Sequence, residues 1–146
     1  MMMESAGEDV VLRPLPLADE TSAGFWDAAK EGRLAIQRCA VCRRWNHAPS
    51  LACPSCGSLD LAYEDVSGRG TLFSWTVLNE PPAPGFRDMV PLIVGVVELA
   101  EQPHLVLGAN ILEANPEELQ LGMELEVIFE KVTDDCTLPQ FRPVRG

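Results

Sequence analysis

Two Cys-x-x-Cys pairs constrain this chain more than any other feature of its sequence. The first pair is Cys39 and Cys42, and ten residues separate it from the second pair, Cys53 and Cys56. Each pair can form a tight turn that presents two sulfurs to one point, so two facing turns make a tetrahedral four-thiolate site. Zinc is the usual ion in such a site. An iron tetrathiolate, or two disulfides in a secreted protein, are the alternatives that the spacing leaves open.

The other residues with reactive side chains do not form a catalytic pattern. Cys136 stands alone near the end of the chain, and we interpret it as an idle thiol. His47 and His104, the two histidines, have no neighbouring serine, cysteine or acid in a known motif, and we expect ordinary surface or turn positions for them. We therefore predict no catalytic residue in this chain. Three acids alternate with apolar residues and predict the charged outer face of a strand, namely Glu124, Glu126 and Glu130.

The charge of the chain is strongly acidic but unevenly spread. The net charge of −11 argues against nucleic-acid binding, which depends on neutralising phosphates. Five of the eleven basic residues nevertheless fall around the first cysteine pair. They either balance the negative thiolates or form a docking patch for a phosphorylated small molecule or an acidic partner. These five residues are Lys30, Arg33, Arg38, Arg43 and Arg44.

No segment has the pattern of a membrane anchor or a signal peptide. The most apolar stretch, residues 90–99, is interrupted by Glu98 and is too short to span a bilayer. The N-terminus turns acidic and lacks the basic patch followed by an apolar run that a signal peptide requires. We therefore predict a cytoplasmic protein that does not bind membranes.

The first half of the sequence predicts an arm, a short helix and a small β ribbon. Prolines favour an extended, flexible arm over residues 1–20. Residues 21–22 are suited to cap a helix over 23–31, which Gly32 would end. Phe25 and Trp26 lie on the apolar side of this helix, where we expect contact with a neighbour, either the ribbon or a partner chain. The expected ribbon strands are residues 33–37, 45–47 and 59–63.

The second half predicts a five-stranded Greek-key barrel. Gly68 and Gly70 mark the boundary at which the chain enters a new sheet. Five segments with strand composition follow, with a small helix over 115–119 between the third and the fourth, which is the arrangement of an OB-fold. In the first of these strands the alternation predicts that Phe73 and Trp75 face the same side, where we expect them to pack in the core, with the wall of a ligand groove as the alternative. The expected strands are residues 71–78, 91–99, 105–108, 123–130 and 138–142.

The expected fold is therefore mostly β, and the twelve prolines and eleven glycines agree with many loops and turns. We divide the chain into the flexible N-terminal arm, 1–20, a unit of N-terminal helix and zinc ribbon, 21–65, and an OB-fold domain, 66–146. A barrel of this kind could bind single-stranded nucleic acid through aromatic side chains and a basic groove. Acids outnumber bases in this half, which disfavours that alternative.

The order of short motifs along residues 20–143 resembles one known family. That family joins a rubredoxin-like zinc ribbon to an OB-fold and is associated with acyl-CoA. The resemblance depends on the whole set of motifs, because none besides the cysteines would suffice alone. The motifs are Phe25-Trp26, Gly32-Arg33-Leu34, Gln37-Arg38-Cys39, Cys53-Pro54, Cys56-Gly57-Ser58, Gly68-Arg69-Gly70-Thr71, Leu121-Gly122-Met123 and Phe141-Arg142-Pro143.

The resemblance implies that the protein is an accessory subunit without catalytic residues of its own. Members of the family sit beside a thiolase-fold, lipid-transfer-protein-like enzyme that acts on acyl-CoA. Known settings are ketothiolase and HMG-CoA synthase complexes, acyltransferase complexes and retro-aldolases that shorten steroid side chains. The resemblance thus implies a hetero-oligomer with a structural zinc ion, and overall likeness slightly favours the steroid aldolase setting.

An acyl-CoA ligand would need cations for its phosphates and an apolar groove for its pantetheine arm. The candidates lie near the ribbon, at the domain boundary and on the proline-rich loop 79–88. An aromatic anchor at a subunit interface would come from the predicted helix, from Phe25 or Trp26. The candidate contacts with acyl-CoA or a partner are Arg38, Arg43, Arg44, Arg69, Phe86 and Arg87.

Overall fold

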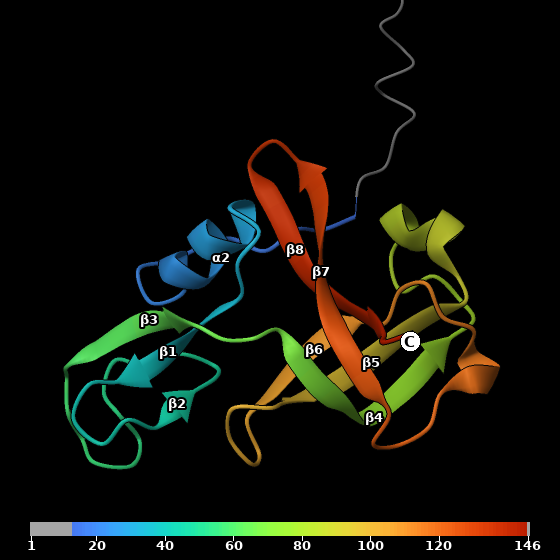
Figure 1. Cartoon of the computed structure of the whole chain (residues 1–146). Helices are drawn as coiled ribbons and strands as arrows, with labels where there is room; N and C mark the ends of the chain where they lie inside the picture. Colours follow the sequence, from blue (N-terminus) through green and yellow to red (C-terminus); the bar gives the residue numbers. More distant parts are fainter. Residues whose placement is uncertain (1–12, 146) are drawn as a thin grey trace, which may run out of the picture.

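The chain forms a ribbon lobe and a barrel lobe that lie side by side (Figure 1). The computed structural model describes residues 13–145, so most of the arm predicted over 1–20 lies outside the described residues. The ribbon lobe holds one helix and an antiparallel sheet in the order β2-β1-β3. Its elements are α2 (Ala23–Lys30), β1 (Ala35–Cys39), β2 (Trp45–Asn46) and β3 (Leu61–Asp65).

The barrel lobe is a five-stranded antiparallel sheet in the order β6-β5-β4-β7-β8. One parallel bridge, between Ile111 and Phe141, brings its two edges together, so the barrel is only partly closed, as in OB-folds. The predicted fold class is confirmed: mostly β, with a helix and zinc ribbon followed by a five-stranded OB-fold. The elements are β4 (Arg69–Leu78), η1 (Pro84–Met89), β5 (Leu92–Leu99), β6 (Val106–Asn110), η2 (Pro116–Glu118), β7 (Glu124–Thr133) and β8 (Cys136–Pro143).

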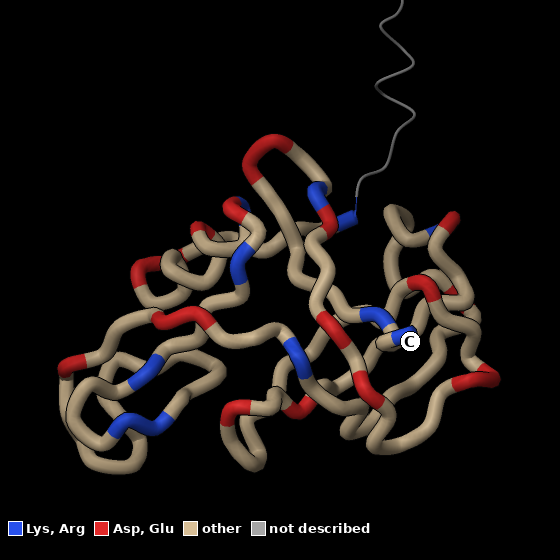
Figure 2. The backbone as a smooth tube through the Cα atoms, in the orientation of Figure 1, with Lys and Arg blue, Asp and Glu red and all other residues tan. Residues whose placement is uncertain are grey.

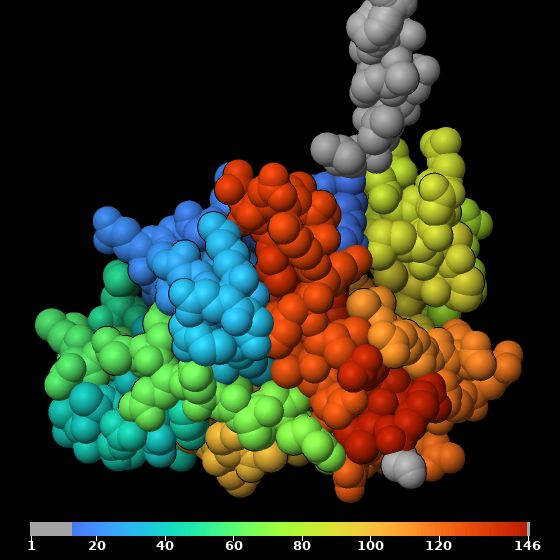
Figure 3. All heavy atoms as spheres, turned by 45° about the horizontal axis from the view of Figure 1, so that its top comes forward, coloured from blue at the N-terminus to red at the C-terminus, as the bar shows by residue number. Residues whose placement is uncertain are grey.

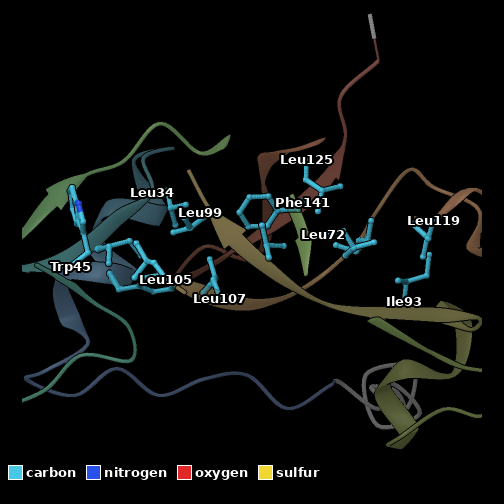
Figure 4. Packing of buried hydrophobic residues seen from close by; sticks show 14 residues of the cluster. Leu34, Trp45, Leu72, Ile93, Leu99, Leu105, Leu107, Leu119, Leu125 and Phe141 are labelled. Atoms are coloured by element: carbon cyan, nitrogen blue, oxygen red, sulfur yellow. The ribbon is translucent and has the colours of Figure 1, made fainter. Parts of the chain in front are cut away.

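The apolar core runs through the barrel and continues into the ribbon lobe (Figure 4). Alternate residues of the strands point inward, as their period of two requires. Leu34 and Trp45 of the ribbon lobe belong to the same buried cluster, so the lobes share a core at their junction. The barrel side chains that are at most 2% exposed are Leu72, Val97, Leu99, Leu125 and Phe141.

The start of α2 differs from the prediction. Ser22 precedes the helix but already has helical dihedral angles (φ −99°, ψ −3°), and its side chain does not cap the helix. Instead, the Ser22 N–H donates to the Asp19 carboxylate (2.8 Å) and the Asp19 N–H donates to Ser22 Oγ (3.1 Å). This reciprocal pair closes the turn just before the helix, one turn earlier than expected.

Phe73 contradicts the prediction that it points into the core with Trp75. A β-bulge lies between Leu72 and Ser74, because Leu72 pairs with Val97 while Ser74 pairs with Val96. The extra residue breaks the alternation and turns Phe73 outward, where its side chain is 51% exposed. Trp75 is partly buried and packs against the core from its edge.

Polar contacts fasten the two lobes to each other. Gln102, in the turn between β5 and β6, accepts a hydrogen bond from the Trp45 N–H (3.0 Å) and donates one to the Trp45 carbonyl (3.1 Å). In the same turn, Glu101 accepts a bond from the Ser67 N–H (2.8 Å), at the crossing from one lobe to the other. The barrel therefore completes the hydrogen bonding of the short strand β2, which makes the junction a defined joint.

The arm residues closest to the barrel pass between two of its loops. Arg13 pairs with Glu130 of β7 (2.9 Å) and donates to the sulfur of Met89 in η1 (3.4 Å). Figure 3 shows this segment between the β7–β8 hairpin and the loop that holds η1. Among residues 13–145, no helix is long and apolar enough to cross a membrane.

Candidate metal centre and neighbouring surfaces

The four cysteines of the two Cys-x-x-Cys pairs come together at the far end of the ribbon lobe. Their sulfurs all lie within 4.8 Å of one another. The Cys39 and Cys56 sulfurs are 3.6 Å apart, as are those of Cys42 and Cys53. A tetrahedral zinc site with Zn–S bonds of about 2.3 Å requires sulfurs about 3.8 Å apart, whereas a disulfide requires about 2.05 Å. The geometry fits a zinc ion and excludes the disulfide alternative.

Two turns of the same design present these thiols. In the first, the Arg43 N–H donates to the Cys39 carbonyl (3.0 Å), and in the second the Gly57 N–H donates to the Cys53 carbonyl (2.8 Å). The residue after each pair has a left-handed backbone, with φ of 65° at Arg43 and 80° at Gly57. At Gly57 this conformation is expected, because glycine adopts it at little cost. Arg43 occupies the equivalent position after the first pair, and only this equivalence indicates that it adopts the same conformation.

Backbone N–H groups prepare the thiols to bind a cation as thiolates. The Cys56 N–H, followed by that of Ser55, lowers the pKa of Cys53 to about 6. The Cys42 N–H likewise lowers the pKa of Cys39 from its ordinary value. The turns thus favour the thiolate form, which binds zinc, at Cys39 and Cys53. At Cys56 the Ser58 N–H also lowers the pKa, but burial and the neighbouring sulfurs outweigh it and raise the pKa to about 11.

The basic residues beside the centre are partly engaged in contacts within the chain. The Arg38 guanidinium lies 4.3 Å above the Trp45 ring and donates to Glu64 (3.2 Å). Arg43 contacts both oxygens of the same Glu64 carboxylate at 3.1 Å. Arg44 is exposed and forms no ion pair with the residues described. Figure 2 shows these bases gathered on the ribbon lobe, so part of the patch balances local charge and part is free.

The remaining predicted contact residues lie far from the metal centre and from each other. Arg69 begins β4, where its guanidinium is 3.8 Å from Glu124 and lines a surface hollow of about 630 Å³. Arg87 and the half-buried Phe86 lie on η1, beyond the other end of β4. A ten-residue strand is about 30 Å long. The structure therefore does not bring the predicted arginines into one site.

Phe25 and Trp26, for which we expected contact with either the ribbon or a partner chain, border an apolar hollow in this chain. Phe25 is 7% exposed and meets the edge of Trp26 at a ring distance of 4.8 Å. The hollow lies between the helix, the arm and the barrel and measures about 430 Å³. We call it the junction hollow. It is lined by Pro16, Ser22, Phe25, Trp26, His47, Pro49, Val94, Leu107, Gly108, Ala109, Asn110, Leu138, Pro139 and Gln140.

Most residues of the junction hollow were not predicted as a site. His47 was expected at an ordinary surface or turn position, but its ring is half-buried and lies 5.5 Å from that of Phe25. Burial lowers the pKa of His47 below its ordinary value. No local sequence signal marks the barrel residues of this wall, because only the packing of the two lobes brings them together.

Comparisons with known proteins agree with this architecture in both lobes. The rubredoxin-like zinc ribbon domain of ChsH2 matches residues 26–62, and the C-terminal OB-fold domain of ChsH2 matches residues 63–130. The chain belongs to the ChsH2 family. The ribbon match and the clustered thiols together show a structural zinc site.

Two relatives are named as a subunit and as a scaffold protein. A probable enoyl-CoA hydratase alpha subunit of Thermomonospora curvata is 38% identical over 132 residues, which are 90% of this chain and 40% of that protein. A DUF35 domain-containing scaffold protein of Pyrococcus furiosus is 35% identical over 56% of this chain and 58% of its own. The chain thus spans only about two fifths to three fifths of these ChsH2-type relatives.

A solved structure covers the fold more completely. A chain of the Ltp2-ChsH2(DUF35) aldolase superposes with a TM-score of 0.80 and 36% sequence identity. The match covers 88% of this chain and 98% of that one. Both lobes of this ChsH2-family chain therefore have a counterpart in a protein that was solved as part of an aldolase.

Proposed function

We propose that this chain is a non-catalytic accessory subunit that docks on a thiolase-fold acyl-CoA enzyme and helps to bind or channel the acyl-CoA. The observation that carries the proposal is the match to a chain of the Ltp2-ChsH2(DUF35) aldolase, which covers 98% of that aldolase chain and 88% of this one. Two relatives are named as scaffold proteins, which also supports an accessory role for this chain. Among the possible reactions we favour the retro-aldol cleavage of a steroid side chain, with thiolase or acyltransferase chemistry as the alternative.

The sequence and the surface of the ribbon lobe agree with this division of work. The cysteines that cluster are suited to hold a metal, and the other described residues show no nucleophile paired with a base. Several large apolar side chains of the ribbon lobe face solvent, which is unusual unless a partner covers them. These are Val41, Leu51 and Leu59, with Leu51 82% exposed. We propose this apolar surface, together with the free edge of Trp26, as the docking surface.

The contact with acyl-CoA would fall to the arginines that are not already engaged. Arg38 and Arg43 share Glu64, so the positive charge that they could offer to a phosphate is partly cancelled. Arg44 and Arg87 have no such acid among the described residues. Since they lie in different lobes, we propose that only one of them meets the nucleotide end of CoA, with the partner enzyme completing the site.

The compartment follows from the same chemistry. The thiols of the metal centre are free, and thiolate zinc sites persist where thiols stay reduced. We therefore propose a cytoplasmic complex rather than a secreted or membrane-bound one.

The test is reconstitution with the acyl-CoA enzyme that the chain captures. Tagged full-length protein is used to isolate its partner from the source organism, and the partner is then assayed for acyl-CoA cleavage with and without the chain. We expect activity to depend on the chain, and the double variant Leu51→Ser, Leu59→Ser to lose capture at unchanged zinc content. A chain that isolates no acyl-CoA enzyme, or a partner whose rate ignores it, contradicts the proposal.

The arginine assignment has its own readout in the same assay. Arg44→Ala or Arg87→Ala is expected to raise the KM for acyl-CoA about tenfold, because a phosphate loses a charged hydrogen-bond partner. Arg33→Ala is the matched control, since Arg33 pairs with Glu31 and Asp65 within the chain. Equal KM values for all three variants would show that CoA does not touch this subunit.

A further inference from the structure

The junction hollow lies over the face of the barrel that OB-folds use to take ligands. That face is the outer surface of the second and third barrel strands, here β5 and β6. Val94 pairs with Asn110 and Val96 pairs with Gly108, so these residues share the face opposite the core residues Ile93 and Val97. The lining of the hollow includes Val94, Gly108 and Asn110.

In this chain other segments cover part of this face, which changes the kind of ligand that the face can accept. Phe25 and Trp26 of α2, His47 and Pro49 of the loop after β2, and Pro16 of the arm cover it. An open OB-fold groove admits a polymer strand, but here these segments cover part of the groove and leave a hollow of about 430 Å³ that is still open to solvent on one side. Pockets for small molecules usually measure roughly 300 to 1,000 Å³. The hollow therefore suits a compound at the small end of that range.

The walls specify an uncharged ligand. Among residues 13–145, no Asp, Glu, Lys or Arg lines the hollow. Its buried polar pair is satisfied internally, because Gln140 donates to Asn110 (3.3 Å) and to Glu130 (3.0 Å) and accepts from the Asn110 N–H (2.7 Å). A charged group would lose its hydration here without gaining a counter-charge.

His47 supplies a polar side chain on the wall that bonds to none of the described residues, whereas the Ser22 hydroxyl already accepts from the Asp19 N–H. Burial alone lowers its pKa, with no hydrogen-bond contribution from any described residue, and the ring is therefore neutral at neutral pH. A neutral imidazole has one donor nitrogen and one acceptor nitrogen. A hydroxyl or carbonyl group on the ligand can use either, while the rings of Phe25 and Trp26 contact its apolar body.

We propose that the junction hollow binds an uncharged, hydrocarbon-rich small molecule whose single hydroxyl or carbonyl group hydrogen-bonds to His47. This site is separate from the arginines proposed to meet CoA, none of which lines it. It requires only this chain, so it can fail or succeed independently of the accessory-subunit role.

The test uses the isolated, zinc-loaded full chain and 2-naphthol, a neutral ring compound with one hydroxyl. We expect saturable NMR shifts that centre on the Trp26 indole, the His47 ring and the Gly108 amide. Gly108→Val fills the hollow, because a Cβ on Gly108 meets no atom within 4 Å and the extra methyl groups then occupy ligand space. We expect it to weaken binding about tenfold or more through steric overlap. Ala62→Val, at an exposed position of β3 outside the hollow, should bind as the native chain does.

Two further variants test the hydrogen bond even if Gly108→Val does not fold. His47→Leu should abolish the preference for 2-naphthol over naphthalene, and His47→Gln should retain it, since an amide replaces both functions of the ring. Naphthalene-2-sulfonate, which is the charged analogue, should bind more weakly than 2-naphthol to the native chain.

Three results overturn the proposal. One is a titration that does not saturate or whose shifts scatter over exposed residues such as Leu51. Another is undiminished binding by Gly108→Val together with an unchanged preference in His47→Leu. The third is a native chain that ignores 2-naphthol while Gly108→Val loses capture of the acyl-CoA enzyme, which would assign the hollow to an apolar side chain of that partner.

Discussion

In the barrel lobe the strands close around fully buried apolar side chains, among them Leu72 and Phe141. In the ribbon lobe the sheet is smaller, β2 has only two residues, and two of the buried side chains are the metal-binding Cys39 and Cys53. Burial of apolar area stabilises the barrel, whereas a lobe of this size needs a metal to order its turns. One chain thus uses apolar burial in one lobe and metal binding in the other, and hydrogen bonds between Trp45 and Gln102 join the two lobes.

Removing the metal should have the largest effect, and it should fall on the ribbon lobe alone. A structural zinc contributes on the order of 10 kcal/mol to the folding of its domain. We expect a strong chelator, or Cys53→Ser, to unfold the ribbon lobe and leave the barrel folded. Trp45 reports on the ribbon lobe and Trp75 on the barrel, so NMR of the two indoles separates the outcomes. Ala62→Val serves as the folded control, and a ribbon lobe that stays ordered without metal would contradict the comparison.

Truncating the barrel core should give the opposite result. Phe141 is fully buried at the closing bridge of the barrel, so Phe141→Ala leaves a cavity and is expected to cost about 3–5 kcal/mol of unfolding free energy. We expect zinc content to stay at one ion per chain, because the four ligands lie in the other lobe. Denaturant unfolding and elemental analysis measure the two effects. A variant that loses zinc along with barrel stability would show that the lobes fold as one unit.

The same contrast explains what the sequence could predict. The cysteine spacing fixed four ligands by local chemistry, and the alternation of apolar residues located the strands of both lobes. The predicted first strand began at Arg33, two residues early, because the Arg33 N–H still bonds to the Ala28 carbonyl of the helix (2.9 Å). Phe73 was misplaced because a bulge, which has no signal in the alternation itself, shifted the register.

Contacts between distant segments were beyond the reach of local patterns. A Cβ at Gly24 would overlap with the Tyr63 ring, so the glycine lets α2 pack onto β3. The Tyr63 hydroxyl also donates to the Thr21 carbonyl (2.7 Å). The hydrogen bonds between Gln102 and Trp45 join residues that are 57 positions apart in the sequence. Only the packed lobes reveal why these residues stand where they do.

Loosening the joint between Trp45 and Gln102 should destabilise the ribbon lobe more than the barrel. Gln102→Leu removes two hydrogen bonds and leaves the Trp45 N–H and carbonyl without their partners, at a cost of about 1–3 kcal/mol. We expect the ribbon lobe to exchange its amides faster while the barrel core is unchanged. Hydrogen exchange of the β1 and β5 amides measures this difference. Gln120→Leu, at an exposed glutamine of the barrel outside the joint, is the matched control. Uniform changes in both lobes would contradict a local joint.

The smallest expected effect is a pH dependence of the contact between His47 and the barrel. Burial lowers the pKa of His47 below its ordinary value of 6.5 in the folded chain. As the pH falls below about 6.5, the unfolded chain therefore binds a proton that the folded chain resists, and the unfolding free energy decreases toward the lowered pKa. The stabilising contribution is complete above the ordinary value and is lost on acidification.

His47→Gln cannot titrate, so the difference in unfolding free energy between the native chain and this variant should change between about pH 7 and pH 5. Taking this difference cancels the acid sensitivity of the zinc site, which both proteins share. If this difference in unfolding free energy does not change with pH, the His47 ring is as well hydrated in the folded chain as in the unfolded one. That outcome would contradict the burial of the ring beside the junction hollow.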